Sequence, residues 1–470
     1  MGDAELIDIP HGWDPGTSPG SNSNRLDNGI VGQDDFHGLP RNHIPEDEMP
    51  PEIAVRKIQH DLAMDGTPAL NLGSFVTTHM DEHARELIVD GLSKNFVHYE
   101  SYPITADIHN RCLNMIANLF HAPDSGRSSD AVGTSTIGSS EAILLATLAM
   151  KKRWVNRQKV AGKDYSAPNL IMSSTIQVCW KKAARYFDIE ERYVFCARDC
   201  YIIDPQAAVE LVDENTIGIC SILGTTYTGE YDDIKAINDL LIERDLDVPI
   251  HVDAASGGFV APFVEPDLVW DFRLEKVVSI NVSGHKYGLV YAGIGWAIWR
   301  SAEYLPKELI FEMNYLGTEQ TSVTLNFSRS ASPIISQYYR LISLGMEGYR
   351  RVMVDLFRVA EYLALHLEEM GTFILLCKKR QQRLPLIAFR LDMTNNYQFD
   401  EFTLSHKLRQ QGGWVVPAYT MAPHNEDVKI LRVVVREDFS KARCDAFIVD
   451  LHLALHSLNM QNTSTSFKVT

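Results

Sequence analysis

Hydrophobic and polar positions follow two alternating patterns through the middle of the chain, between about residues 131 and 300. Short β-branched and apolar runs are separated by stretches with helical periodicity. The apolar runs are NLIM, RYVF, IGICSIL, PIHVDA, KVVSINV and GIGWAIW, and the helical stretches include residues 141–158, 178–187 and 234–244. Strands that alternate with helices are typical of βαβ units, so we expect a mostly parallel sheet with helices on both faces.

The pattern changes at both ends of this region. A long helical stretch at 336–370 is followed by strand-like PLIAFRL, WVVP and ILRVVV and by a last helix at 442–458, which predicts a smaller α+β domain. Residues 52–66 also have helical periodicity, and residues 11–50 contain too little apolar surface to offset their ordering entropy. We therefore expect an N-terminal arm and helix (1–69), a large domain (70–356) and a small C-terminal domain (357–470).

Composition and charge narrow the class of protein. The 470 residues are 45% hydrophobic and 22% charged, as in a globular protein, and the net charge of −17 disfavours nucleic acid or an anionic membrane as partners. Apolar runs stay well below the roughly 18 residues that a membrane span needs. Seven scattered cysteines without a C-x-x-C motif, and no Lys or Arg before Arg25, predict a protein of the reducing cytoplasm.

Candidate chemistry begins with HVDAASGGF at 251–259, where Asp253 ends a predicted strand and small residues follow. Small residues allow backbone to approach a planar ligand closely. A carboxylate at this position can keep a pyridine nitrogen protonated, which is what pyridoxal phosphate requires to accept electrons. The alternative is an ordinary aspartate in a turn at the end of a strand.

The stretch NVSGHKYGLV places Lys286 between Gly284 and Gly288, after the next predicted strand. Asp253 and Lys286 could therefore emerge from the same sheet edge, where ligands bind in open α/β sheets. A partly desolvated lysine amine forms a Schiff base with an aldehyde cofactor. A surface lysine after a glycine is the alternative.

VGTSTIGSSEA at 132–142 supplies a candidate anion site, because Ser139 and Ser140 precede a helix expected to begin near Glu141. The same residues would also suit a simple helix cap. Ser283 and Lys286 match the S-x-x-K motif of serine acyl-enzymes, but the chain has neither S-D-N nor K-T-G. No cluster of His or Cys lies near His251 in the sequence, so we expect no metal site.

In order and spacing, the segments GSSEA, IQVCWKKAARYF, LGTTYTGEY, HVDAASGGFVAPF, SGHKYG and TLNFSRS resemble the pyridoxal-phosphate-dependent glutamate decarboxylases, of the group II amino-acid decarboxylases. The resemblance runs from Ile44 almost to the C-terminus. It implies an α/β, aminotransferase-like fold of type I, pyridoxal 5'-phosphate as cofactor, and α-decarboxylation of L-glutamate to 4-aminobutanoate and carbon dioxide. Decarboxylation of L-aspartate or a related acidic amino acid is the near alternative, and an inactive scaffold of the same fold is a distant one.

The resemblance also implies residue roles. Lys286 would bind the cofactor covalently, Asp253 would face its ring nitrogen, and Gln177 and Ala255 would lie against opposite faces of the ring. The remaining expected cofactor contacts are Ser139, Ser140, Ser283 and His285 at the phosphate and Thr226 beside the ring oxygen. Ser328 matches a position that reaches the phosphate of a neighbouring subunit, which implies a homodimer or a higher homo-oligomer with shared active sites.

The expected substrate contacts are Ser74, Phe75, Asn95, His98 and Arg432. His98 stands where the family normally has an acidic residue that contacts the distal carboxyl group of the substrate. A protonated imidazole could donate to a carboxylate, or the side chain could fill the pocket and favour a different acid such as aspartate. A surface-facing His98 without a substrate role is the third possibility.

The C-terminal sequence SFKVT differs from two regulatory patterns in the family. It lacks the histidine before the last residue with which certain bacterial members close the active site, and it lacks the basic amphipathic tail with which plant members bind calmodulin. Neither form of regulation is therefore assumed for this chain.

Overall fold

The computed structural model describes residues 39–123, 131–313, 320–377, 382–395 and 397–466, with side chains up to residue 460. The chain divides into two units, Met1–Asp65 and Gly66–Thr470, which are described separately. Most of the expected N-terminal arm and the C-terminal SFKVT (466–470), apart from the backbone of Ser466, lie outside the described residues. In the first unit, helix α1 (Pro51–Leu62) begins with a proline at its first turn and buries none of its side chains.

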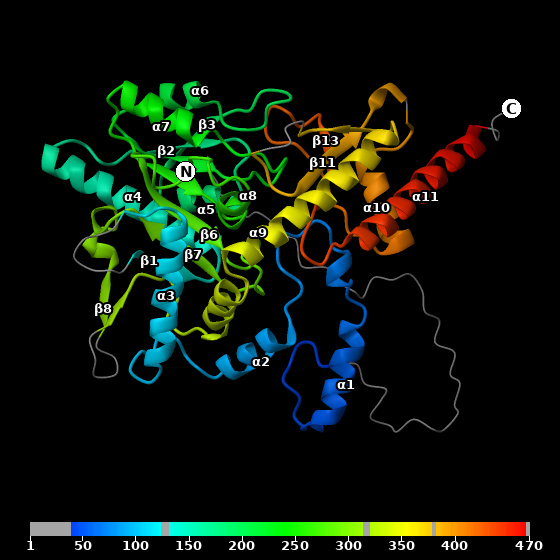
Figure 1. The fold of residues 1–470 in the computed structure, drawn as a ribbon, viewed down its shortest axis with the longest axis horizontal. Helices are drawn as coiled ribbons and strands as arrows, with labels where there is room; N and C mark the ends of the chain where they lie inside the picture. Colours follow the sequence, from blue (N-terminus) through cyan, green and yellow to red (C-terminus); the bar gives the residue numbers. More distant parts are fainter. Residues whose placement is uncertain (1–38, 124–130, 314–319, 378–381, 396, 467–470) are drawn as a thin grey trace, which may run out of the picture. The chain divides into compact units, whose positions relative to one another are not determined.

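A seven-stranded sheet forms the centre of the second unit (Figure 1). Its order is β1-β7-β6-β5-β4-β2-β3. The bounds are β1 (Val132–Thr136), β2 (Asn169–Ser173), β3 (Glu190–Val194), β4 (Thr216–Ile222), β5 (Ile250–Asp253), β6 (Val277–Ser283) and β7 (Gly295–Trp299). All pairings from β3 to β6 are parallel, which confirms the expected mostly parallel sheet. β7 is antiparallel to both neighbours, because the connection from β6 is too short for a crossover.

Helices cover both faces of this sheet. Their bounds are α4 (Ser139–Ala161), α5 (Val178–Tyr186), α6 (Pro205–Glu210), α7 (Ile234–Glu243) and α8 (Ala261–Val264). Leu170 and Met172 of β2 pack into the core that α4 and α5 share, whereas Ile171 between them packs into the larger core on the opposite face. α4 begins two residues earlier than expected, so Ser139 and Ser140 lie in its first turn rather than before it.

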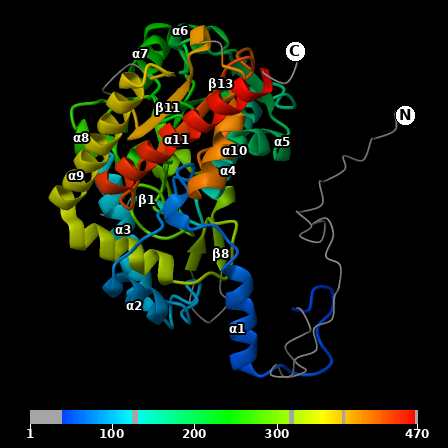
Figure 2. The ribbon, with the colours of Figure 1, turned by 90° about the vertical axis from the view of Figure 1, so that its right-hand side faces the viewer.

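The C-terminal part is a smaller α+β region that begins with a long helix, α9 (Ser332–Glu369). This helix bends at Gly345, whose φ of 58° is left-handed, and the bend is visible in Figure 2. The remaining elements are an antiparallel sheet, β10 (Phe373–Leu375), β11 (Leu386–Leu391), β13 (Lys429–Val434) and β12 (Ala418–Thr420) in spatial order, with α10 (Glu401–Gly412) and α11 (Lys441–Ser466). The domain boundaries at 69/70 and 356/357 stay predictions, and the second one falls inside α9.

The expected strand WVVP (414–417) is wrong, because the strand β12 begins only after Pro417. Proline lacks the N–H that a ladder needs, and Val415 instead exchanges backbone hydrogen bonds with Leu70 and Leu72. Several elements had no counterpart among the sequence-based expectations. They include β1, α6, α8, β10 and α10, together with α2 (Glu82–Gly91), α3 (Pro103–Leu119), the β8 (Phe311–Met313) and β9 (Gln320–Ser322) pair, and short 3-10 turns at Pro68–Leu70, Gly257–Phe259, Ala302–Tyr304, Lys307–Leu309 and Met393–Asn395.

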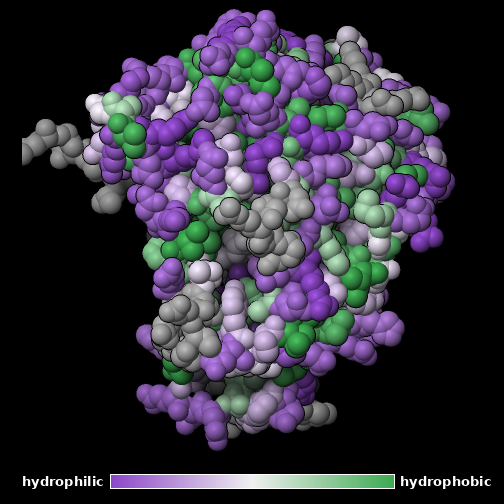
Figure 3. Space-filling model, turned by 60° about the vertical axis from the view of Figure 1, so that its left-hand side comes forward, coloured by the Kyte–Doolittle hydropathy of each residue, from purple (hydrophilic) through white to green (hydrophobic). Residues whose placement is uncertain are grey.

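The surface is mixed in polarity. On the face drawn in Figure 3, hydrophobic residues lie in scattered groups among hydrophilic ones, and the coloured residues form no single continuous apolar patch. Within the part of the chain that the structure describes, no helix is both long and apolar enough to cross a membrane.

Candidate active site

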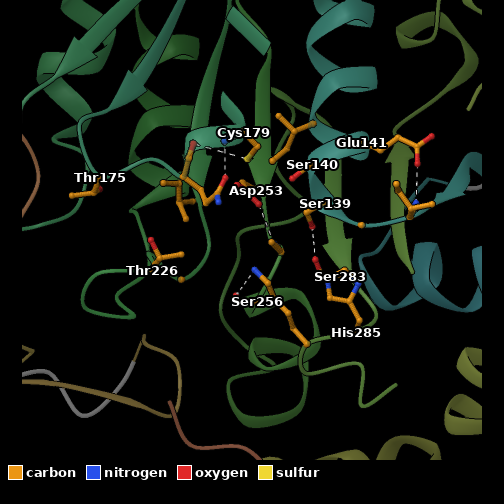
Figure 4. Close-up of a pocket in the computed structure, with 18 residues that line it drawn as sticks. Ser139, Ser140, Glu141, Thr175, Cys179, Thr226, Asp253, Ser256, Ser283 and His285 are labelled. Atoms are coloured by element: carbon orange, nitrogen blue, oxygen red, sulfur yellow. Dashed lines mark hydrogen bonds between the residues drawn. The ribbon is translucent and has the colours of Figure 1, made fainter. Parts of the chain in front are cut away.

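A cavity of about 350 Å³ lies at the carboxyl ends of the parallel strands β4, β5 and β6 (Figure 4). Asp253 is the last residue of β5, and Lys286 follows the end of β6 by three residues. Both side chains line this cavity. The structure therefore brings the two candidate catalytic groups to one sheet edge, as parallel strands allow.

Asp253 is buried and is surrounded by hydrogen-bond donors. Its Oδ2 accepts from Trp180 Nε1 at 2.9 Å, and its Oδ1 accepts from Asn281 Nδ2 at 3.0 Å and from the Ala255 N–H at 3.2 Å. These donors offset the cost of burying a carboxylate. The group can therefore remain a hydrogen-bond acceptor at the floor of the cavity.

Lys286 Nζ donates to Ser256 Oγ at 3.2 Å and lies 5.4 Å from the centre of the Phe75 ring. Burial lowers the pKa of Lys286, the carboxylate of Asp253 opposes that shift, and the charge of Arg432 adds to it. A lowered pKa makes the neutral, nucleophilic amine easier to reach. Thr77 holds this loop through hydrogen bonds to the carbonyls of His285 and Lys286, at 3.0 and 2.8 Å.

The N-terminus of α4 forms the second end of the cavity. Ser139 Oγ and Ser283 Oγ are 2.6 Å apart, and Ser140 and His285 line the same space. A Cβ on Gly138 would lie 2.9 Å from His285 Cε1, so the absence of a side chain lets the ring pack against this turn. Burial, together with the charge of Lys286, lowers the pKa of His285 to about 4. Hydroxyl groups and the unpaired N–H groups of a helix start are suited to a phosphate.

Gln177, Thr226 and Ala255 line the walls between these two ends. Gln177 precedes α5 and accepts the Cys179 N–H at 2.6 Å, so the residue caps the helix as well as facing the cavity. The carbonyl of Thr226 accepts a hydrogen bond from Arg432. These contacts fix the walls before any ligand enters.

The chemistry of these groups fits pyridoxal phosphate. The amine of Lys286 could bind the aldehyde of the cofactor, and the buried carboxylate of Asp253 lines the same cavity. The serine hydroxyls at the start of α4 line another wall. The volume is within the range of small-molecule sites. These side chains thus match the aldehyde, the ring nitrogen and the phosphate of the cofactor.

Ser74, Phe75 and Arg432 are not among the residues that line the cavity, but the Phe75 ring lies close to Lys286, and Arg432 belongs to β13 of the small sheet. The guanidinium carbon of Arg432 lies 4.9 Å from the centre of the Phe75 ring, and Nη2 donates to the Gly73 carbonyl at 2.7 Å. Its Nε is buried without a hydrogen-bond partner among the described residues. The Ser74 hydroxyl accepts the Val76 N–H at 3.1 Å. Arg432 therefore places a positive charge close to Lys286.

The structure does not bring Asn95, His98 and Ser328 to this cavity within one chain. Asn95 Nδ2 donates to Ser328 Oγ at 3.1 Å, and Asn95 pairs with Ser330 in an isolated β-bridge. His98 lies in the turn before α3, where its carbonyl accepts the Tyr102 N–H at 2.9 Å. These residues form a second, separate cluster, and none of them lines the cavity.

Sequence reasoning missed several residues at the site, among them four with polar side chains or hydrogen-bond partners within it. Cys179 and Thr175 line the cavity, Ser256 binds Lys286, and Trp180 binds Asp253. Ser256 could have been found, because it lies in the same short segment as Asp253. Nothing in the local sequence singles out Trp180, since its contact with β5 depends on how α5 packs.

Comparisons with known proteins agree with this geometry. A family model described as "Pyridoxal-dependent decarboxylase conserved domain" matches residues 45–392. A solved sphingosine-1-phosphate lyase from Burkholderia pseudomallei has a TM-score of 0.75 at 22% identity, covering 91% of this chain and 95% of that chain, and shows the same fold. Fold and cavity therefore define a pyridoxal-phosphate-dependent enzyme with the type I, aminotransferase-like fold.

Two relatives with higher sequence identity show which kind of pyridoxal-phosphate-dependent enzyme this chain resembles. A glutamate decarboxylase from Petunia hybrida is 50% identical over 426 residues, which is 90% of this chain and 84% of the relative. A glutamate decarboxylase structure from Lactobacillus brevis is 44% identical with a TM-score of 0.87, covering 91% of this chain and 97% of that chain. The chain belongs to the glutamate decarboxylase family, as the sequence motifs led us to expect.

Proposed function

We propose that this protein is a carboxy-lyase that converts L-glutamate to 4-aminobutanoate and carbon dioxide. The observation that carries the proposal is the meeting of Lys286, Asp253 and the α4 serines around one cavity. The chain's relatives at up to 50% identity, over 90% of its length, are named glutamate decarboxylases. Fold alone would not distinguish this reaction from aminotransfer, so the family relationship selects decarboxylation.

When bound, pyridoxal phosphate would supply the electron sink for the electron pair that departing carbon dioxide leaves behind. Lys286 would hold the cofactor covalently through Nζ. Asp253 would keep a proton on the ring nitrogen, and Gln177, Ala255 and Thr226 would contact the ring. The phosphate contacts would be Ser139, Ser140, Ser283 and His285. Lys286 and Asp253 are the residues that we assign as catalytic.

An acidic substrate needs a local cation in a protein with a net charge of −17. Arg432 would meet this need, because no carboxylate pairs with it among the described residues and its two Nη atoms donate only to the backbone carbonyls of Thr226 and Gly73. The Phe75 ring lies close to both Arg432 and Lys286 and, with Ser74, would shape the space for the substrate. We therefore assign Ser74, Phe75 and Arg432 to substrate binding.

We further propose that Asn95, His98 and Ser328 act in the active site of a neighbouring subunit. Ser328 is exposed and Asn95 is half-buried, and both lie outside the cavity of their own chain. A homodimer, or a higher homo-oligomer built from it, would bring this second cluster to the partner's cavity. A sedimentation measurement that found only monomers in an active preparation would contradict this arrangement.

His98 keeps L-aspartate open as a second candidate substrate. Carbon dioxide and amine release from glutamate and from aspartate would be compared in the wild-type enzyme, in His98→Asp and in His83→Asp. His83 is an exposed histidine of α2 and serves as the matched control. We expect glutamate to be the better substrate, and His98→Asp alone to change the ratio of the two rates. A wild-type enzyme that prefers aspartate would refute the glutamate assignment.

A cytoplasmic location, without nucleic acid or membrane as partner, is part of the same proposal. The support is the net charge of −17 and the seven cysteines, none of which forms a disulfide. Fractionation of cells that express the chain, with activity measured in each fraction, tests it.

A further inference from the structure

A line of buried polar residues extends behind Asp253, away from the cavity. In the register of the parallel pair β5 and β6, His251 lies opposite Ser279 and Asp253 lies opposite Asn281. His251 Nδ1 is 2.7 Å from Ser279 Oγ, and His251 Nε2 is 2.7 Å from Asn281 Oδ1. Asn281 Nδ2 then donates to Asp253 Oδ1. One connected chain of hydrogen bonds thus ends on the candidate catalytic carboxylate.

Which atom donates in each of these hydrogen bonds follows from the carboxylate of Asp253 at the end of the line. A carboxylate accepts only, so Asn281 must present its amide NH₂ to Asp253 and its carbonyl oxygen to His251. His251 Nε2 must then carry a hydrogen. Burial lowers the pKa of His251 to about 4, so the ring is neutral near pH 7 and Nδ1 accepts from the Ser279 hydroxyl. All the donors therefore point towards Asp253.

Trp180 binds the second carboxylate oxygen of Asp253. Its Nε1 donates to Asp253 Oδ2 at 2.9 Å, and its ring contacts the His251 ring edge to face, with 5.2 Å between the ring centres. Trp180, His251 and Asn281 are each fully buried. With both oxygens of Asp253 held, the carboxylate cannot rotate without leaving a buried donor unpaired, which is costly.

We propose that Trp180, Asn281 and His251 are positioning residues, which hold the Asp253 carboxylate in the orientation that receives the proton-bearing ring nitrogen of the cofactor. The inference rests on the proposed cofactor site, but it does not depend on which amino acid is decarboxylated. A purely structural network would support the fold without affecting how the protein distinguishes cofactors with and without a ring nitrogen.

The test measures the affinity of the full-length protein, freed of cofactor, for two ligands. One is pyridoxal phosphate, and the other is an analogue in which carbon replaces the ring nitrogen. Trp180→Phe removes one N–H from Asp253 and retains an aromatic ring. Trp299→Phe is the matched control, because Trp299 is also buried but its Nε1 has no hydrogen-bond partner among the described residues.

We expect Trp180→Phe to weaken pyridoxal phosphate binding about ten-fold, which corresponds to about 1.4 kcal/mol. Binding of the analogue should change less than about two-fold, and Trp299→Phe should affect neither ligand. Equal weakening of both ligands by Trp180→Phe, or no weakening of either, would overturn the proposal. Because turnover is not measured, failure of the glutamate assignment would be seen separately, as absent carbon dioxide release by the wild-type enzyme.

A pair of His251 variants provides an independent measurement if Trp180→Phe does not fold. His251→Gln retains an amide N–H near the Nε2 position, whereas His251→Asn places its amide near the Nδ1 position, out of reach of Asn281. We expect the glutamine variant to bind pyridoxal phosphate within about three-fold of wild type, and the asparagine variant to bind it about ten-fold more weakly. Equal affinities in the two variants would contradict the role of the Nε2 donor.

Discussion

His109 provides a prediction whose sign and size follow from its surroundings. Its side chain is buried between the rings of Phe96 and Trp296, and it accepts the Ser135 N–H at Nε2, at 3.1 Å. Nδ1 therefore carries the hydrogen and donates to Asn110 Oδ1 at 3.0 Å. Burial lowers the pKa of His109 to about 4, and the hydrogen bond to Asn110 only partly opposes this. Protonation would place an N–H against the Ser135 N–H.

The folded-state pKa of His109 lies below the value of about 6.5 in the unfolded chain, so the unfolded state binds the proton first as the pH falls. Stability from this residue is therefore present above about pH 6.5 and is lost between about pH 6.5 and pH 4. From the two pKa values, the free energy of unfolding falls by about 2 kcal/mol between pH 8 and pH 5. Below about pH 4 the contribution stops changing.

Urea unfolding at pH 8 and pH 5 tests this in wild type and in His109→Gln. Glutamine can still accept the Ser135 N–H but takes up no proton. We expect the variant to lose about 2 kcal/mol less than wild type over this range. His251 and His285 titrate alike in both proteins, so they cancel in the comparison. His83→Gln, at an exposed position, should behave as wild type. Parallel losses in wild type and His109→Gln would refute the reasoning.

Four further variants test the active site. Lys286→Ala should lose cofactor on dialysis and all turnover, which absorbance and carbon dioxide release would show; retained activity would contradict its role. Asp253→Asn should keep the cofactor attached but lower the rate at least about 100-fold, since the charge that keeps the ring nitrogen protonated is gone. Arg432→Gln should raise KM for glutamate about ten-fold with a smaller change in kcat, and an unchanged KM would exclude it from the substrate site. Gly138→Ala, whose Cβ would lie 2.9 Å from His285 Cε1, should weaken cofactor binding in a direct titration.

The parallel core of the fold could be predicted because buried parallel strands are apolar runs of a characteristic length. β4, β5 and β6 lie where the sequence indicated, and α5 and α7 end within one residue of their expected ends. The antiparallel direction of β7 could not be read from its own residues, since it depends on the short connection after β6. The false strand at 414–417 arose because periodicity does not reveal which partner a segment will find.

The residues of the site also fall into those that the sequence could predict and those that it could not. Asp253 and Lys286 were predictable, because ends of parallel strands meet at one edge. The grouping of Asn95 with Ser328 was not, since the two lie 233 positions apart in the chain and meet through a hydrogen bond outside the main sheet. In the proposed homodimer, whether His98 meets a substrate depends on a second subunit, and no pattern within a single chain determines that contact.

The sequence of β6 contains a signal from which the buried hydrogen-bond network could have been predicted. A strand buried on both faces should be apolar throughout, yet VVSINVS carries a polar residue at every second position from Ser279 onwards. Ser279, Asn281 and Ser283 point to one face, and they bind His251, Asp253 and Ser139 in turn. Each buried polar group must find a hydrogen-bond partner, so polar residues at alternate positions of a buried strand predict a line of hydrogen bonds to the neighbouring elements. Followed towards the carboxyl end of the strand, that line leads to the functional edge of the sheet. Here the line ends at the turn that carries Lys286.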